Sequence, residues 1–210
     1  NVMYALSKAA NIRKNSNGEY AILGIPYAQY LKGEFDFAKN IRIDYRNSFA
    51  FHAGVGIAVP YGNAKTIPFE KQYFSGGANS VRDLGPGSFA GNGNLLDQSG
   101  DIKLDASIEY RSKLFWKFQG AVFIDAGNIW TIRSYANQPG GVFKFDRFYK
   151  QIAVAYGLGL RLDLDFFILR FDGGMKAVNP AYETRKEHFP IIHPKFSRDF
   201  AFHFAVGYPF

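Results

Sequence analysis

The sequence has no cysteine among its 210 residues, which excludes thiolate metal sites, thiol catalysis and a disulfide framework. It also has no apolar run near the roughly 18 residues that a membrane-spanning helix needs. The glycine-rich stretches SGGANS and AGNGN lack the Lys and Ser or Thr of a phosphate-binding loop, so nucleotide binding is not supported. We expect no metal and no cofactor, because no HExxH motif or paired metal-ligand spacing occurs at His52, His188, His193 or His203.

The composition is apolar and aromatic, although the mean hydropathy is slightly negative. Apolar residues make up 47% and aromatic residues 18%, with 22 Phe and 13 Tyr. A membrane β-barrel reconciles these values, because its strands alternate lipid-facing apolar residues with lumen-facing polar ones. The net charge of +7 does not predict nucleic-acid binding, since Lys and Arg are scattered singly through the strands. Lining of the lumen or contact with anionic outer-leaflet lipid explains the charge.

A two-residue alternation of apolar and polar side chains recurs along the chain. It is clearest in 101–111, whose apolar positions are Ile102, Leu104, Ala106, Ile108 and Tyr110. The period predicts eight strands, at 2–10, 26–42, 47–60, 101–111, 115–130, 151–165, 166–176 and 199–210. Their lengths suit tilted strands that cross a bilayer.

The connections between these strands alternate in length, as they do in outer-membrane barrels. Short turns, expected to face the periplasm, lie at 43–46, 113–114 and 165, and long connections at 11–25, 61–100, 131–149 and 179–197. We therefore predict an all-β, antiparallel transmembrane β-barrel. A soluble two-sheet sandwich is the alternative, and it would need the Phe-rich strand faces inside.

The long connection 61–100 contains the most informative motif. Its segment QYFSGGANSVRDLGPGSFAG, residues 72–91, resembles the conserved loop of the bacterial surface antigen family, which includes the BamA and TamA assembly factors and the two-partner secretion transporters. The matching residues are Gly76, Gly77, Ser80, Val81, Arg82, Gly85 and Gly87.

The resemblance implies that connection 61–100 folds into the barrel lumen, where Arg82 pairs with acidic wall residues. One is Asp125, in a wall motif with Phe123 and Gly127, and the other is Glu109. The two-residue alternation independently puts both carboxylates on the lumen face. An arginine suits this role because its planar fork of donors can satisfy two carboxylates together.

Two further features refine the resemblance. Asp83 and Leu84 follow the arginine, where family members usually have glycine and an aromatic residue, and the continuation LGPGS, residues 84–88, is similar to a TamA-like branch of Bacteroidetes-type bacteria. The last strand resembles a β-signal, the pattern by which barrels are recognised for assembly, or else an aromatic belt at the membrane interface. Its residues are Phe204, Val206, Tyr208 and Phe210.

The resemblance implies that residues 1–210 are the C-terminal portion of a sixteen-stranded barrel domain, with the POTRA repeats absent. It implies an assembly or translocation factor of the bacterial outer membrane that inserts or exports client proteins through a barrel with a lateral gate. The expected partners are outer-membrane lipid or lipopolysaccharide, client outer-membrane or secreted proteins, and the rest of its own barrel and POTRA domains.

Other functions agree less well with the sequence. A passive porin needs no inward arginine, and a stand-alone eight-stranded barrel has little room for connection 61–100. A Ser, His and Asp hydrolase would need a serine beside His52 or His203 on a lipid-facing surface, whereas both histidines fall on lumen faces. Asp163 and Asp165 share one face, but charged residues are common in a lumen. We therefore expect that the protein is not an enzyme.

Overall fold

The computed structural model describes residues 13–14, 18–22, 25–75, 99–134, 140–182 and 184–207. The chain divides into two units, residues 1–33 with 58–72 and residues 34–57 with 73–210. In the part of the chain that is described, no helix is long and apolar enough to cross a membrane.

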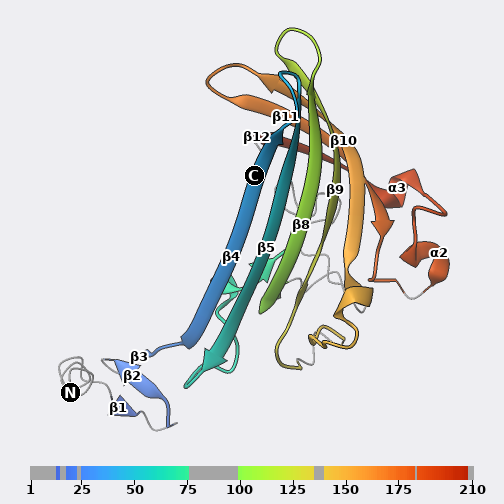
Figure 1. The fold of residues 1–210 in the computed structure, drawn as a ribbon. Helices are drawn as coiled ribbons and strands as arrows, with labels where there is room; N and C mark the ends of the chain where they lie inside the picture. Colours follow the sequence, from blue (N-terminus) through green and yellow to red (C-terminus); the bar gives the residue numbers. More distant parts are fainter. Residues whose placement is uncertain are drawn as a thin grey trace. The chain divides into compact units, whose positions relative to one another are not determined.

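The larger unit is built on a seven-stranded sheet with the order β12-β11-β10-β9-β8-β5-β4 (Figure 1). Apart from a small two-stranded pair, β6 and β7, each strand lies beside the strand that precedes it in the chain, and the pairs from β5 to β12 are antiparallel. The strands are β4 (Gln29–Arg42), β5 (Asn47–Tyr61), β8 (Ile102–Lys113), β9 (Phe118–Trp130), β10 (Ala153–Asp163), β11 (Ile168–Val178) and β12 (Phe200–Val206).

The polarity of the two sheet faces is the reverse of that in a soluble protein: apolar side chains are exposed and charged ones are buried. Large apolar side chains on one face are exposed: Ile108 by 49%, Ile124 by 54% and Leu158 by 67%. On the other face Glu109 and Asp125 are fully buried. A soluble sandwich buries its large apolar residues, so this distribution contradicts the sandwich and agrees with a lipid-facing outer surface and a polar interior.

Short turns and long connections alternate along the sheet as the sequence predicts, but the turn expected at 113–114 lies at 114–117 and the one expected at 165 extends over 164–167. The turns at 43–46, 114–117 and 164–167 close the hairpins β4–β5, β8–β9 and β10–β11. The long connections contain η1 (Phe69–Lys71), β6 (Tyr73–Phe74), β7 (Ser99–Gly100), η2 (Phe148–Gln151), α2 (Arg185–His188) and α3 (Phe196–Asp199).

The smaller unit contains a three-stranded sheet of β1 (Arg13–Lys14), β2 (Tyr20–Ile22) and β3 (Ile25–Pro26), in that order. Asn63 ties this unit together, because its Nδ2 donates to the carbonyl of Tyr20 at 2.6 Å and its Oδ1 accepts from the amide of Tyr20 at 2.8 Å. The segment 11–25, which we expected to be a connection, therefore contains short strands.

The predicted strand 2–10 lies outside the described residues, so seven of the eight predicted strands can be compared. The predicted strand 199–210 starts one residue later, at Phe200, because Asp199 belongs to α3 and accepts a hydrogen bond from the amide of Lys195 at 2.8 Å.

Candidate functional site

The inner face of β8 and β9 carries the acidic residues that the sequence singled out. Glu109 on β8 and Asp125 on β9 lie on the same face, as the alternation predicts, and both are fully buried. Ser107 is the register partner of Asp125 and donates its Oγ hydrogen to Asp125 Oδ1 at 2.8 Å.

Glu109 forms ion pairs with two guanidinium groups. Arg111 Nε donates a hydrogen bond to Oε1 at 2.6 Å, and Arg161 Nη2 lies 2.7 Å from Oε2. A buried carboxylate is tolerated only when it is paired and hydrogen-bonded. These two arginines therefore allow Glu109 to remain charged in the wall.

The ion pairs continue from Glu109 across the sheet to β11. Arg161 Nη1 lies 3.5 Å from Asp172 Oδ1, and Arg170 Nε lies 3.0 Å from Asp172 Oδ2. We call the connected residues the arginine network: Arg111, Glu109, Arg161, Asp172 and Arg170. All five side chains are at least 96% buried, and three cations face two anions.

Small residues on β10 make room for this network. A Cβ added to Gly159 would collide with Asp172 Oδ1 and Arg161 Nη1, so both side chains occupy the space above this glycine. A Cβ added to Gly157 would collide with Phe123 Cζ. The wall-motif residue Phe123 is 1% exposed, and its ring therefore lies against Gly157.

The predicted site residues are placed only in part. Gly76, Gly77, Ser80, Val81, Arg82, Gly85, Gly87, Tyr208 and Phe210 lie outside the described residues. Gly127 pairs with Asp105 on β8 and Ala153 on β10. Phe204 and Val206 lie on β12 and are 57% and 64% exposed, as expected of a lipid-facing strand. The pairing of Arg82 with the wall stays a prediction.

Connection 61–100 has buried residues in both of its described parts, 61–75 and 99–100. In the first part, Tyr73 is 6% exposed and packs over Gly56, where an added Cβ would lie 2.6 Å from its hydroxyl. Burial, together with the charge and hydrogen bond of Glu34, raises the pKa of Tyr73 to about 12. In the second part Ser99 is 7% exposed, and β7 pairs with β6. Tyr73 thus covers the inner face of β5 at Gly56.

His52 belongs to a polar cluster and not to a hydrolase triad. Its Nε2 lies 2.8 Å from Asp36 Oδ2, and its Nδ1 lies 3.2 Å from Asp105 Oδ2. Ser107 is its register partner, but the hydroxyl of this serine is donated to Asp125. Among the residues that the structure describes, no group of three or more His, Cys, Asp or Glu side chains is arranged to hold a metal ion.

The sequence reasoning missed four members of the arginine network: Arg111, Arg161, Arg170 and Asp172. A signal was present, because Glu109 and Arg111, and likewise Arg170 and Asp172, are two residues apart and share a strand face. The contacts between strands depend on register, however, which the spacing within one strand does not give.

Comparison with known proteins shows which proteins the chain resembles. The chain is 34% identical over 95 residues to the outer membrane protein assembly factor BamA of Neisseria meningitidis serogroup B, with 39% of this chain and 11% of that protein covered. It superposes on the crystal structure of BamA from Haemophilus ducreyi lacking POTRA domains 1–3 with a TM-score of 0.59 and 17% identity, over 85% of this chain and 35% of that one. CdiB from Acinetobacter baumannii gives a TM-score of 0.49 at 16% identity, over 85% and 27%.

The chain thus spans about a tenth of the BamA sequence that it matches and about a third of the solved BamA chain. The superposition confirms the predicted fold class, an antiparallel sheet that resembles the wall of a BamA barrel. The Omp85 superfamily domain matches residues 12–210. Members of this superfamily are outer-membrane β-barrel proteins of bacteria, which confirms the predicted localisation. With nearly its whole length matched, the chain belongs to the Omp85 superfamily.

Proposed function

We propose that the protein is an outer-membrane assembly or translocation factor that inserts or exports client proteins, and that Arg82 holds connection 61–100 inside the barrel by pairing with Asp125 and Glu109. One observation carries the proposal: two fully buried carboxylates lie on adjacent strands of the inner wall. The burial of Tyr73 and Ser99 in connection 61–100 and the superfamily membership support it.

The two carboxylates have different surroundings in the wall. Glu109 accepts a hydrogen bond from Arg111 Nε and forms an ion pair with Arg161, so we assign it the role of fixing these two arginines as well as of pairing with Arg82. We assign Asp125, on the adjacent strand and the same face, as the second acceptor of Arg82.

The proposal has finer parts that rest on the sequence motifs. LGPGS at 84–88 supports the TamA-like branch, and the aromatic terminal strand supports client handling at a lateral gate beside β12. The residues are assigned to the C-terminal half of a sixteen-stranded barrel that works with POTRA domains and membrane lipid. Edge pairing with client strands involves no covalent chemistry, so the proposal includes no catalytic step.

The test replaces Arg82 and Asp125 in the protein within living cells. Arg82→Ala and Asp125→Asn should each lower the level of assembled outer-membrane or secreted client proteins. The double variant should be little worse than either single one, because the two residues act as a pair. Arg147→Ala is the matched control, since this arginine is 56% exposed and pairs with neighbouring Asp146 at 3.4 Å.

Folding must be separated from function in this test. In Arg82→Ala, the gel mobility of the unheated, folded barrel should stay unchanged. The amount of protein in the membrane should also stay unchanged. Normal client levels in that variant, at normal abundance, would overturn the role of Arg82. Additive losses in the double variant would show that Arg82 and Asp125 act separately.

A further inference from the structure

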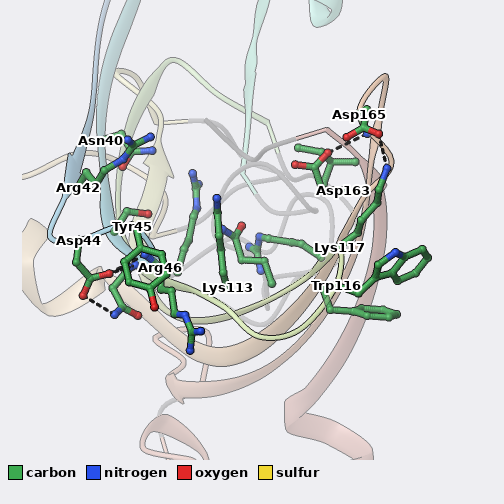
Figure 2. Close-up of a pocket in the computed structure, with 17 residues that line it drawn as sticks. Asn40, Arg42, Asp44, Tyr45, Arg46, Lys113, Trp116, Lys117, Asp163 and Asp165 are labelled. Carbon is green, nitrogen blue, oxygen red and sulfur yellow. Dashed lines mark hydrogen bonds and ion pairs between the residues drawn. The ribbon is translucent and has the colours of Figure 1, made fainter.

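The two ends of the sheet have their basic side chains in different surroundings. Beside the short turns, a pocket of about 640 Å³ is lined by Arg42 and Lys113 and by two buried arginines of the arginine network, so its cations lie on the inner polar face (Figure 2). At the opposite end, residues 179–199 join β11 to β12, and the basic residues of this segment share it with exposed apolar side chains. We call this segment the β11–β12 connection.

The exposed apolar side chains of the β11–β12 connection lie in one short stretch. Ile191 is 56% exposed, Ile192 62% and Phe196 68%. Pro190, just before them, is buried, and the amide of Ile191 donates to the carbonyl of Ala177 on β11 at 3.4 Å. The stretch therefore begins at a fixed point beside the end of β11, while its large side chains remain outside the protein core.

Phe196 connects this stretch to the lipid-facing surface of the sheet. Its ring stacks on the ring of Phe200 on β12, with the centroids 4.3 Å apart and the planes inclined by 15°. Phe200 lies on the outer face, because a Cβ added to Gly173 would be 3.2 Å from its ring, and Gly173 is the register partner of Leu158. Leu158 is 67% exposed on that face. The outer apolar surface of β12 thus continues onto α3.

The polar side of the β11–β12 connection is held by one cluster of charges. Arg198 Nε donates to Asp199 Oδ1 at 2.6 Å, and Arg198 Nη1 donates to Glu187 Oε1 at 3.2 Å. This cluster joins α2 to α3, because Glu187 belongs to α2 and Arg198 to α3. The exposed stretch lies between the two helices and is therefore fixed at both of its ends.

The other charges that the structure describes in the β11–β12 connection are positive. Arg185, Lys186 and Lys195 are exposed, and none of them forms an ion pair with a carboxylate of the described residues. The two carboxylates described in the connection both pair with Arg198. Basic residues combined with exposed Ile and Phe are typical of segments that lie in a membrane interface, where the apolar side chains enter the bilayer and the cations attract anionic headgroups.

We propose that the β11–β12 connection lies in the outer leaflet of the membrane, with its exposed Ile and Phe side chains among the acyl chains and Lys186 and Lys195 at anionic lipid headgroups. The long connections of a barrel otherwise extend outside the bilayer. The stack of Phe196 on Phe200 favours lipid as the occupant, because it makes the stretch continuous with a surface that already faces lipid. The inference rests on the outer-membrane location and not on the assembly role proposed above.

The test attaches the fluorophore NBD to the β11–β12 connection of the whole protein in vesicles of phosphatidylcholine and phosphatidylglycerol. Residues 1–210 contain no cysteine, so Ile192→Cys provides a labelling site. Leu158→Cys reports the lipid-facing sheet, and Asp146→Cys is the matched control, because Asp146 is 69% exposed in another long connection. We expect blue-shifted emission from Ile192→Cys. A nitroxide near the lipid headgroup should quench it about twofold more than the control.

The outcomes separate lipid from water and from protein. Emission and quenching of Ile192→Cys equal to those of Asp146→Cys would place the connection in water and overturn the proposal. A blue shift without quenching by the nitroxide lipid would overturn it as well, because protein would then cover the stretch. If that blue shift disappeared when the protein was diluted with lipid, the covering protein would be a second copy of this chain.

The charge of the headgroup is tested with the same probe. Quenching of Ile192→Cys should be stronger with phosphatidylglycerol than in pure phosphatidylcholine, and added salt should reduce the difference. Lys186→Gln/Lys195→Gln should abolish the difference, whereas Lys144→Gln/Lys150→Gln, which removes the same charge from exposed positions between β9 and β10, should keep it. Equal quenching in the two lipids, or equal effects of the two double variants, would overturn the contact of the lysines with anionic headgroups.

Discussion

Arg161 on β10 and Glu109 on β8 are joined side chain to side chain across the strand between them, with Nη2 2.7 Å from Oε2. Backbone hydrogen bonds connect each strand of the sheet only to its immediate neighbours. This ion pair therefore adds a connection between strands that share no backbone bond. Because both side chains are at least 99% buried, we expect it to matter for the stability of the wall.

Replacing Glu109 by Gln should destabilise the barrel strongly. The variant leaves Arg111 and Arg161 beside a neutral acceptor in a buried site, and breaking a buried ion pair costs about 3 to 5 kcal/mol. The measurement is the free energy of unfolding in urea from lipid vesicles. Glu187→Gln is the control, because this glutamate is 39% exposed and pairs with Arg198 at 3.2 Å. It should cost less than about 1 kcal/mol, and a similar loss in both variants would contradict the prediction.

Gly159→Ala should displace the network by steric collision. The new methyl group would meet Arg161 Nη1 and Asp172 Oδ1, and overpacking of this kind costs about 1 to 3 kcal/mol. Gly120→Ala on β9 is the matched control, since its Cβ would lie 3.5 Å from Leu114 Cδ1, an ordinary contact. Unfolding midpoints of the two variants give the comparison, and a control as unstable as Gly159→Ala would refute the steric argument.

The pKa of Tyr73, raised to about 12 by burial and by Glu34, predicts a stability change at high pH. The folded state keeps the phenol proton more tightly than the unfolded chain, whose tyrosine has a pKa near 10. The contribution of Tyr73 to the free energy of unfolding is fully present below pH 10. It decreases as the pH rises to 12, by up to about 1.4 kcal/mol per pH unit. Unfolding in urea between pH 9 and 12 measures it.

Tyr73→Phe should remove this component of the pH dependence and should cost about 1 kcal/mol at pH 8, through the lost hydrogen bond to Glu34. Tyr149→Phe is the control, because this tyrosine is 57% exposed. An unchanged alkaline slope in Tyr73→Phe would show that another group causes it.

Asp199→Asn should open the connection between β11 and β12. Arg198 donates to Asp199 through Nε at 2.6 Å and Nη2 at 2.9 Å. Burial alone would raise the pKa of Asp199, but the bonds from Arg198 and the Lys195 amide outweigh it and hold the pKa below 3.8. The ion pair between Arg198 and Asp199 is therefore fully formed at neutral pH. Its stabilising effect is lost only as the pH falls below about 3.8.

Limited proteolysis measures this opening directly. At pH 8, trypsin should cleave near Arg185 and Lys195 faster in Asp199→Asn than in the unchanged protein. Asp146→Asn provides the control, because Asp146 is 69% exposed and lies in another connection. Equal cleavage of all three proteins would mean that the Arg198 contact does not close this segment.

The two-faced strands could be predicted from sequence because a strand repeats every two residues and the membrane separates apolar from polar side chains. The same rule put Glu109 and Asp125 on one face without any knowledge of their contacts. It also predicted the short turns, since the alternation stops there. The helical position of Asp199 was not predictable in this way, because it depends on a local hydrogen bond to the Lys195 amide.

The arginine network needed information that a single strand does not contain. Arg161 has Gln119 and Arg170 as its register partners on β9 and β11, yet its guanidinium reaches Glu109 and Asp172 diagonally. These contacts depend on the space above Gly159 and on side-chain length. In the sequence this packing is reflected by the glycine at position 159, and only the structure shows which side chains fill the space.

The order of the sheet also bears on how the wall is assembled. The hairpins β8–β9 and β10–β11 each close through a short local turn, so either can pair without waiting for distant parts of the chain. The contact between Arg161 and Glu109 joins the two hairpins and can form only after β9 and β10 have paired. A spectroscopic probe at this contact would therefore mark the moment at which two independently formed hairpins become one continuous wall.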